Sequence, residues 1–220
     1  LCVIGVTGSG KSSLLSAILG DMPTVWDLSD EQDHGYSSEN LAHYTRVVQG
    51  TTAYVPQQSF IFNDTVRGNI LFGKEYDEEK YEIALNKSYL AKDLLLFPNG
   101  DETELGESGV NLSGGQKQRI SLARAIYAEA DLYLFDDPLS ALDAHVGRAV
   151  FENCIEGILK KRKATRILVT NQVEFLTKCD NIIVMNNGSI VEKGSYQNLM
   201  NGNNPHFKNI VASQQQNNND

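Results

Sequence analysis

A glycine-rich segment near the start of the chain has the residue types and spacing of a phosphate-binding loop. Residues 5–12 read GVTGSGKS, which fits the pattern GxxxxGK[ST] between an apolar run and a run with helical spacing. Successive backbone N–H groups of such a turn can surround phosphate oxygens, and the helix N-terminus adds a favourable dipole. The phosphate-binding residues that we predict are Gly5, Thr7, Gly8, Ser9, Gly10, Lys11, Ser12 and Ser13.

Two side chains of this loop, together with a distant carboxylate, predict a site for a magnesium-bound phosphate. The Lys11 ammonium would reach the outer phosphates as a point charge, and the Ser12 hydroxyl would be a Mg²⁺ ligand. The apolar run 132–135 ends in two carboxylates, Asp136 and Asp137. Because α/β sheets bind ligands beyond the carboxyl ends of their strands, we predict that Asp136 is the second magnesium residue.

The elements that must position these residues alternate between short β-rich runs and stretches with helical spacing. The predicted strands are 1–6, 51–55, 132–135 and 167–170, and the mainly helical stretches are 11–19, 64–72, 77–97, 115–129 and 144–159. This alternation predicts an α/β fold with a mostly parallel sheet. Asn187 and Gly188 between two further β-rich runs predict a hairpin, so that an antiparallel pair closes the sheet.

The length of 220 residues fits one domain with an inserted subdomain. We predict a phosphate-binding α/β core over 1–56 and 119–200, a helical subdomain over 57–118, and a tail over 201–220. The tail ends in a Gln/Asn-rich stretch from Gln214 that predicts disorder.

A polar, acidic insertion at about 24–45 interrupts the predicted core. Its composition favours a disordered segment, with a docking or phosphorylation segment at Ser29, Ser37 or Ser38 as the alternative.

Charge and cysteine usage exclude several other classes of protein. Nineteen Lys and Arg against 28 Asp and Glu give a net charge of −9, which argues against a nucleic-acid partner. No apolar run approaches the ~18 residues that a membrane-spanning helix needs. Cys2, Cys154 and Cys179 are odd in number and far apart, so we expect neither a disulfide framework nor a zinc site, and a reducing compartment fits best.

Residues 112–116, LSGGQ, carry a resemblance to a known family. The pentapeptide resembles the signature motif of ABC-type ATPases, Gln57 in YVPQ resembles their Q-loop glutamine, and Asp143 in SALD resembles their D-loop. The resemblance implies a P-loop NTPase core of the RecA-like kind, an inserted helical subdomain, and ATP and Mg²⁺ as ligands. It also implies that Gln57 acts in catalysis and at the metal.

In the family that this chain resembles, the signature acts on a nucleotide held by a second nucleotide-binding domain, in a head-to-tail pair. The residues that correspond to the signature are Ser113, Gly114, Gly115 and Gln116. The physical chemistry agrees with this role, because Ser113 and the free amides at the start of a helix can bind a γ-phosphate.

Two further segments resemble the C subfamily, the multidrug-resistance-associated type. They are residues 66–73, VRGNILFG, and residues 140–146, SALDAHV. Members of this subfamily are full transporters with two unequal nucleotide-binding domains, and this chain resembles the first. Residues 103–109 resemble an exporter segment that touches the transmembrane domains, although a plain polar loop remains the alternative.

The chain departs from the ABC pattern at two positions. Asp137 stands where most members have a glutamate that polarises the attacking water, and Asn171 stands where they have a switch histidine. Asparagine can donate a hydrogen bond but has no titratable proton. Both changes predict slow hydrolysis at this domain's own site, and the alternative is that neighbouring groups compensate.

The resemblance implies an ATP-binding domain at the cytoplasmic face of a membrane, as part of an integral membrane exporter. Because the chain opens on an apolar run without Met, we expect a fragment of a longer protein. The resemblance implies that the residue that stacks on adenine lies upstream of Leu1. Two other functions remain open: a soluble ABC ATPase of translation or repair, and a nucleotide sensor that does not hydrolyse ATP.

Overall fold

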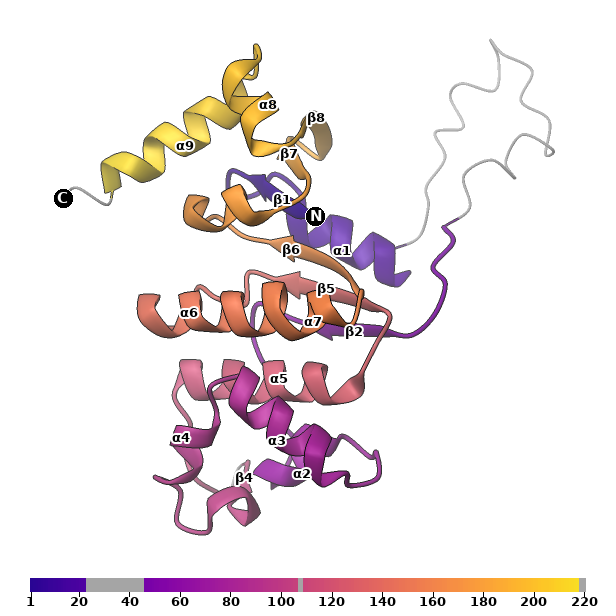
Figure 1. The fold of residues 1–220 in the computed structure, drawn as a ribbon, viewed down its shortest axis with the longest axis vertical. Helices are drawn as coiled ribbons and strands as arrows, with labels where there is room; N and C mark the ends of the chain where they lie inside the picture. Colours follow the sequence, from indigo (N-terminus) through magenta and orange to yellow (C-terminus); the bar gives the residue numbers. More distant parts are fainter. Residues whose placement is uncertain (23–45, 107–108, 218–220) are drawn as a thin grey trace.

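The computed structural model describes residues 1–22, 46–106 and 109–217. Within these residues the central element is a six-stranded sheet (Figure 1). In spatial order the strands are β2 (Thr52–Val55), β5 (Leu132–Asp136), β6 (Thr165–Val169), β1 (Cys2–Gly5), β7 (Ile182–Asn186) and β8 (Ser189–Gly194). All neighbouring pairs are parallel except β7 and β8, which are antiparallel. The predicted α/β class and the predicted hairpin are therefore confirmed.

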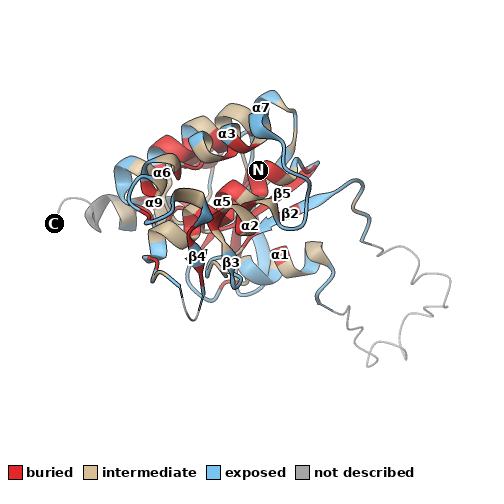
Figure 2. Cartoon of the chain, turned by 90° about the horizontal axis from the view of Figure 1, so that it is seen from below, coloured by how far each residue is buried: buried red, intermediate tan, exposed pale blue. Residues whose placement is uncertain are grey.

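Successive residues of the central strands face two apolar layers in turn, one on each side of the sheet. Ile4 of β1 and Phe135 of β5 face the larger layer, whereas Val3 and Leu134 face the smaller one. Helix α1 (Lys11–Leu19) covers the smaller layer with the buried Leu15. Figure 2 shows the central part of the sheet and the inner faces of the helices as buried. This period of two is what a strand buried on both faces requires.

Two long helical stretches cover the larger layer, one of which is irregular. The first is α5 (Gly114–Ala128). The second begins as α6 (Ala144–Val150), widens into the π-helix η4 (Phe151–Ile158) and ends as α7 (Leu159–Lys161). We predicted the second stretch as one continuous helix, and its π-helical part was not foreseen. Among the helices of the described ranges, none combines the length and the apolar character needed to cross a bilayer.

Three short helices lie beyond α5, at the end of the molecule farthest from the C-terminus (Figure 1). They are α2 (Val66–Leu71), α3 (Glu78–Lys87) and α4 (Ala91–Leu94), accompanied by a small antiparallel pair of β3 (Asp64–Thr65) and β4 (Glu104–Leu105). The helix that we predicted over 77–97 is broken because Tyr89 adopts a left-handed conformation, with φ of 60°. The predicted helix 64–72 begins only at Val66, after the Thr65 hydroxyl caps it.

The C-terminal part of the chain corrects one prediction. After α8 (Tyr196–Asn201), helix α9 extends over Pro205–Asn217, so residues 214–217 are helical rather than disordered. Tertiary packing overrides the polar composition here, because α9 buries Phe207 and Val211 in the larger layer. The predicted insertion at 24–45 and the last residues of the tail lie outside the described residues.

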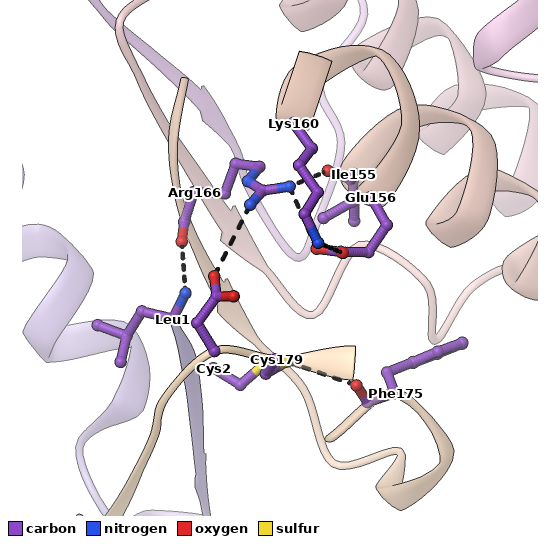
Figure 3. Close-up of polar contacts among 9 residues, drawn as sticks. Leu1, Cys2, Ile155, Glu156, Lys160, Arg166, Phe175 and Cys179 are labelled. Carbon is purple, nitrogen blue, oxygen red and sulfur yellow. Dashed lines mark hydrogen bonds and ion pairs between the residues drawn. A yellow bond between two sulfur atoms is a disulfide. The ribbon is translucent and has the colours of Figure 1, made fainter. Parts of the chain in front are cut away.

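The cysteines correct a second prediction, since Cys2 and Cys179 form a disulfide (Figure 3). They are 177 residues apart in sequence, but β1 pairs with β7, and Cys179 comes shortly before β7, so their Cα atoms are 6.1 Å apart. The expectation of a reducing compartment rested on unpaired cysteines and loses that support. Cys154 is a free thiol, and complete burial raises its pKa to about 12.

Candidate active site

A cavity of about 310 Å³ lies beyond the carboxyl ends of the central strands. β1, β6 and β5 are neighbours in the sheet and β2 lies beside β5, so the segments that follow these strands converge. The residues that line the cavity are Thr7, Gly8, Ser9, Gly10, Lys11, Ser12, Ser13, Gln57, Asp136, Asp137, Val169 and Asn171. The structure thus places nearly all the residues that we predicted for this domain's own site around one cavity.

The backbone of the loop between β1 and α1 is shaped by glycine. Gly8 and Gly10 have φ angles of 81° and 96°, in the left-handed region that side chains disfavour. Gly10 is also the N-cap of α1 and offers no side-chain cap, and the first turn contains no acidic residue. The Ser9 hydroxyl is buried without a hydrogen-bond partner among the described residues. The loop therefore fits an anion that accepts hydrogen bonds.

The turn of the β7–β8 hairpin contacts this loop directly. The Gly188 N–H donates to the Ser9 carbonyl oxygen at 3.0 Å. A Cβ atom added at Gly10 would lie 3.3 Å from the Gly188 Cα atom. We predicted the hairpin from its Asn-Gly turn, but no local pattern indicated that the turn would contact the loop.

Lys11 folds back over the loop that precedes it. Its Nζ atom donates to the Gly5 carbonyl at 2.7 Å and to the Val6 carbonyl at 3.0 Å. Loss of water on partial burial lowers the pKa of Lys11, and the carboxylates of Asp137 and Asp136 act in the opposite direction. The ammonium is therefore held at the cavity near both carboxylates.

The predicted magnesium pair is in contact. The Ser12 hydroxyl donates to Asp136 Oδ1 at 3.1 Å, although the two residues are 124 apart in sequence. A hydroxyl and a carboxylate are the oxygen donors that Mg²⁺ prefers, so the residues present fit this metal.

A tyrosine that the sequence did not single out reaches the same carboxylate. The Tyr54 hydroxyl donates to Asp136 Oδ2 at 3.5 Å. Burial and the nearby Asp136 carboxylate raise the pKa of this hydroxyl. The alternation along β2 could have revealed it, because Ala53 and Val55 face the larger layer and leave Tyr54 on the other face.

Asp137 and Asn171 both line the cavity, where they follow the neighbouring strands β5 and β6. Asp137 has a φ of 48°, and its N–H donates to the Val169 carbonyl at 3.0 Å. Burial is the main cause that raises the pKa of the Asp137 carboxyl, and Asp136 adds to it. Asn171 is half-buried, whereas Gln57, after β2, is exposed.

The four signature residues lie at the start of α5 and are not among the residues that line this cavity. The Ser113 hydroxyl accepts a hydrogen bond from the Gln116 N–H at 3.2 Å, and Gln116 Oε1 accepts from the Ser113 N–H at 3.0 Å. Ser113 and Gly114 are exposed, and a Cβ atom at Gly114 would meet no described atom within 4 Å. Asp143 is exposed at the start of α6 and makes no capping hydrogen bond in the described structure.

A parallel sheet whose strand β1 leads through a GxxxxGK[ST] loop into a helix, with a carboxylate at the end of a nearby strand, defines a P-loop NTPase. The family model of the ABC transporter matches residues 1–140. The chain belongs to the ABC transporter family, as its resemblance to ABC-type ATPases had indicated.

The relatives belong to the C subfamily. The chain is 52% identical over 202 residues to human ATP-binding cassette sub-family C member 2, a match that covers 91% of this chain and 12% of the relative. It is 48% identical over 199 residues to ABC transporter C family member 12 of Dictyostelium discoideum, covering 90% of this chain and 14% of the relative. The match to ABC transporter C family member 9 of Arabidopsis thaliana is 50% identical over 200 residues and covers 91% and 12%. The chain therefore spans about an eighth of the length of these relatives.

The loop geometry predicts different costs for two alanine substitutions. At Gly5 a Cβ atom would lie 2.4 Å from the Met185 carbonyl oxygen, whereas at Gly8 it would meet no atom within 4 Å. We expect Gly8→Ala to cost about 1 to 2 kcal/mol through backbone strain alone. Gly5→Ala should cost about 3 kcal/mol through overlap with the backbone. Urea unfolding of the two variants measures this difference, and equal costs would contradict the packing described for β1 and β7.

Proposed function

We propose that this chain is the ATP-binding domain of an exporter, and that it binds Mg-ATP in the cavity at the carboxyl end of β1. The observation that carries the proposal is the contact between Ser12 and Asp136 beside the open amides of the loop. A phosphate chain would take its hydrogen bonds from these amides and from the unpartnered Ser9 hydroxyl.

Each side chain of the cavity has a separate part in this proposal. Lys11 would exchange its two backbone carbonyl partners for phosphate oxygens, which carry more negative charge. Ser12, Asp136 and Gln57 would hold Mg²⁺, and Tyr54 would keep the Asp136 carboxylate oriented. When bound, Mg²⁺ neutralises charge on the outer phosphates.

The signature fits a site that two domains share. Because Ser113 and Gly114 are exposed and lie outside the cavity, they are available to a nucleotide held by a second nucleotide-binding domain. We propose a head-to-tail pair in which ATP lies between one domain's phosphate loop and the other's signature. Asp143, exposed at the start of α6, would contact the partner domain in that pair.

Slow hydrolysis at this domain's own site is the second part of the proposal. Asp137 is one methylene shorter than glutamate, and hydrogen bonds at both its N–H and its carbonyl hold its backbone in place. Asn171 can donate a hydrogen bond to a γ-phosphate but cannot supply a positive charge. Complete loss of hydrolysis would make the chain a nucleotide sensor, the function that these two residues favour next.

An exposed aromatic cluster supports coupling to transmembrane domains. Phe60, Phe62 and Phe72 are 49%, 40% and 56% exposed, and the Arg124 guanidinium lies 4.9 to 5.4 Å from the three ring centroids. Loss of water on burial lowers the pKa of Arg124 to about 10. Contiguous exposed aromatic rings are typical of interaction surfaces. Because Phe60 follows Gln57 closely in the chain, a displacement of this cluster by a bound transmembrane domain would move Gln57, which lines the cavity.

The organisation of the chain follows from these roles. We propose a core of 1–56 and 119–200, a helical subdomain of 57–118 that transmits motion, and a C-terminal segment of 201–220. We further propose that the domain works at the cytoplasmic face of a membrane. Of the segment 103–109, for which we propose contact with the transmembrane domains, only 103–106 and 109 are described.

The first functional prediction concerns binding. Lys11→Ala removes the ammonium that the loop holds over the cavity, so nucleotide affinity should fall by at least about tenfold, since hydrogen bonds to charged groups contribute about 1.5 to 3 kcal/mol. The measurement is photolabelling of the full-length protein with azido-ATP, with Lys193→Ala on the exposed edge of β8 as the matched control. Unchanged labelling in folded Lys11→Ala protein would remove the basis of the proposal.

The second functional prediction concerns chemistry. Asp137→Glu combined with Asn171→His should raise single-turnover hydrolysis at this site by about tenfold or more, because a positioned acid or base typically contributes 10²- to 10⁴-fold. Nucleotide affinity should stay within about twofold, since neither residue belongs to the phosphate loop. Asp180→Glu, at an exposed position, is the control for the added methylene. A flat rate in the double variant, with the partner domain present, would show that these two residues do not limit hydrolysis.

A further inference from the structure

A buried carboxylate lies directly behind the signature. Asp93 of α4 receives two hydrogen bonds from the Arg119 guanidinium, from Nε at 2.6 Å and from Nη2 at 2.8 Å. The two side chains are only 11% and 13% exposed. This bidentate ion pair joins α4 to the second turn of α5, the helix that begins with the signature.

The same carboxylate also holds the last residue of the signature. Gln116 Nε2 donates to Asp93 Oδ1 at 3.3 Å, while Gln116 Oε1 accepts the hydrogen bond from the Ser113 N–H. An amide has one donor side and one acceptor side. If the Gln116 amide were flipped, its oxygen would face the carboxylate and its NH₂ group would face the Ser113 N–H. Asp93 therefore selects the orientation of Gln116 that caps the helix.

This orientation fixes the backbone of Ser113, because Gln116 Oε1 then accepts from the Ser113 N–H. The Ser113 oxygen accepts from the backbone N–H of Gln116, so the hydroxyl proton remains to be donated outward from an exposed position. The Arg119 guanidinium lies close to the signature, since a Cβ atom added at Gly115 would be 3.3 Å from its Nη1 atom. Asp93 neutralises its charge there. Without the carboxylate, an unpaired guanidinium would lie against the backbone of the signature.

We propose that Asp93 is a positioning residue for the signature. Through the Gln116 side chain it fixes the backbone of Ser113 at the start of α5, and so places the Ser113 hydroxyl toward the γ-phosphate of the partner domain's nucleotide. This inference rests on the proposed function, in which the signature completes the partner's site. Asp93 does not touch the nucleotide, so its effect must depend on Gln116.

That dependence is testable with a double-mutant cycle in the full-length protein. Asp93→Ala leaves the buried Arg119 guanidinium unpaired both with and without Gln116, so that cost is common to the two arms of the cycle. Asp93→Ala should lower kcat for ATP hydrolysis at least fivefold while Gln116 is present, with KM changed less than twofold. When Gln116→Ala is also present, the further loss caused by Asp93→Ala should be less than twofold. Equal losses in both cases would overturn the proposal, because they would assign Asp93 to packing alone.

Two controls distinguish failure of the role proposed for Asp93 from failure of the shared nucleotide site on which that role rests. Glu156→Ala removes a half-buried ion pair with Arg166, between η4 and β6, neither of which carries a signature residue (Figure 3), and should lower the melting temperature without changing kcat. Ser113→Ala tests the foundation itself, since it should abolish most of the turnover. Normal turnover in Ser113→Ala would reject the shared site and the inference with it, whereas a collapse in Ser113→Ala with additive effects of Asp93 and Gln116 would reject the inference alone.

Discussion

The turn from β1 into α1 is the constraint on which the rest of the structure depends. The chain leaves a buried strand and enters a helix within a few residues, and it does so with left-handed glycines. Because the N-cap Gly10 has no side chain, it does not cap the first amides of the helix in the described structure. The arrangement is stable only if other segments hold the turn. Gly188 of the hairpin holds it through the Ser9 carbonyl, and Lys11 bonds the carbonyls of Gly5 and Val6.

Helix α5 links this site to the rest of the domain. Its first turn presents Ser113, its second turn is tied to α4 through Arg119, and further along Arg124 lies beneath the exposed aromatic cluster. The buried Gln118 side chain donates to the Pro56 carbonyl at 3.5 Å, next to Gln57. A displacement of α5 would therefore change the signature, the aromatic cluster and the segment that carries Gln57 together.

The parts of the fold that the sequence predicted depend on local patterns. The apolar runs of β1 and β5, the glycine-rich turn between a strand and a helix and the Asn-Gly turn are short-range signals, and the structure contains each of these elements. The parts that it missed depend on contacts between distant segments. Cys2 and Cys179 meet only because β1 pairs with β7, and a lone Asp93 in a helical stretch gives no sign that Arg119 will lie beside it.

Helix α9 is a second case in which a local pattern did not reveal contacts with distant segments. Its Gln/Asn-rich end has the composition of a disordered tail, but Gln214 accepts a hydrogen bond from the Val173 N–H, and Phe207 is fully buried. Composition indicates how much apolar surface a segment contributes by itself, whereas this helix is ordered by its contacts with the rest of the chain.

The central claim is that the signature of this domain acts on a nucleotide held by another domain. Gly114→Asp tests it directly, because a Cβ atom there would meet no described atom within 4 Å, whereas the phosphates of a nucleotide held across an interface would be repelled by the carboxylate. The measurement is steady-state ATP hydrolysis by the full-length variant, together with nucleotide labelling of each domain. Turnover should collapse while labelling of this domain's own loop survives. Normal turnover, or a loss of labelling confined to this domain, would contradict it.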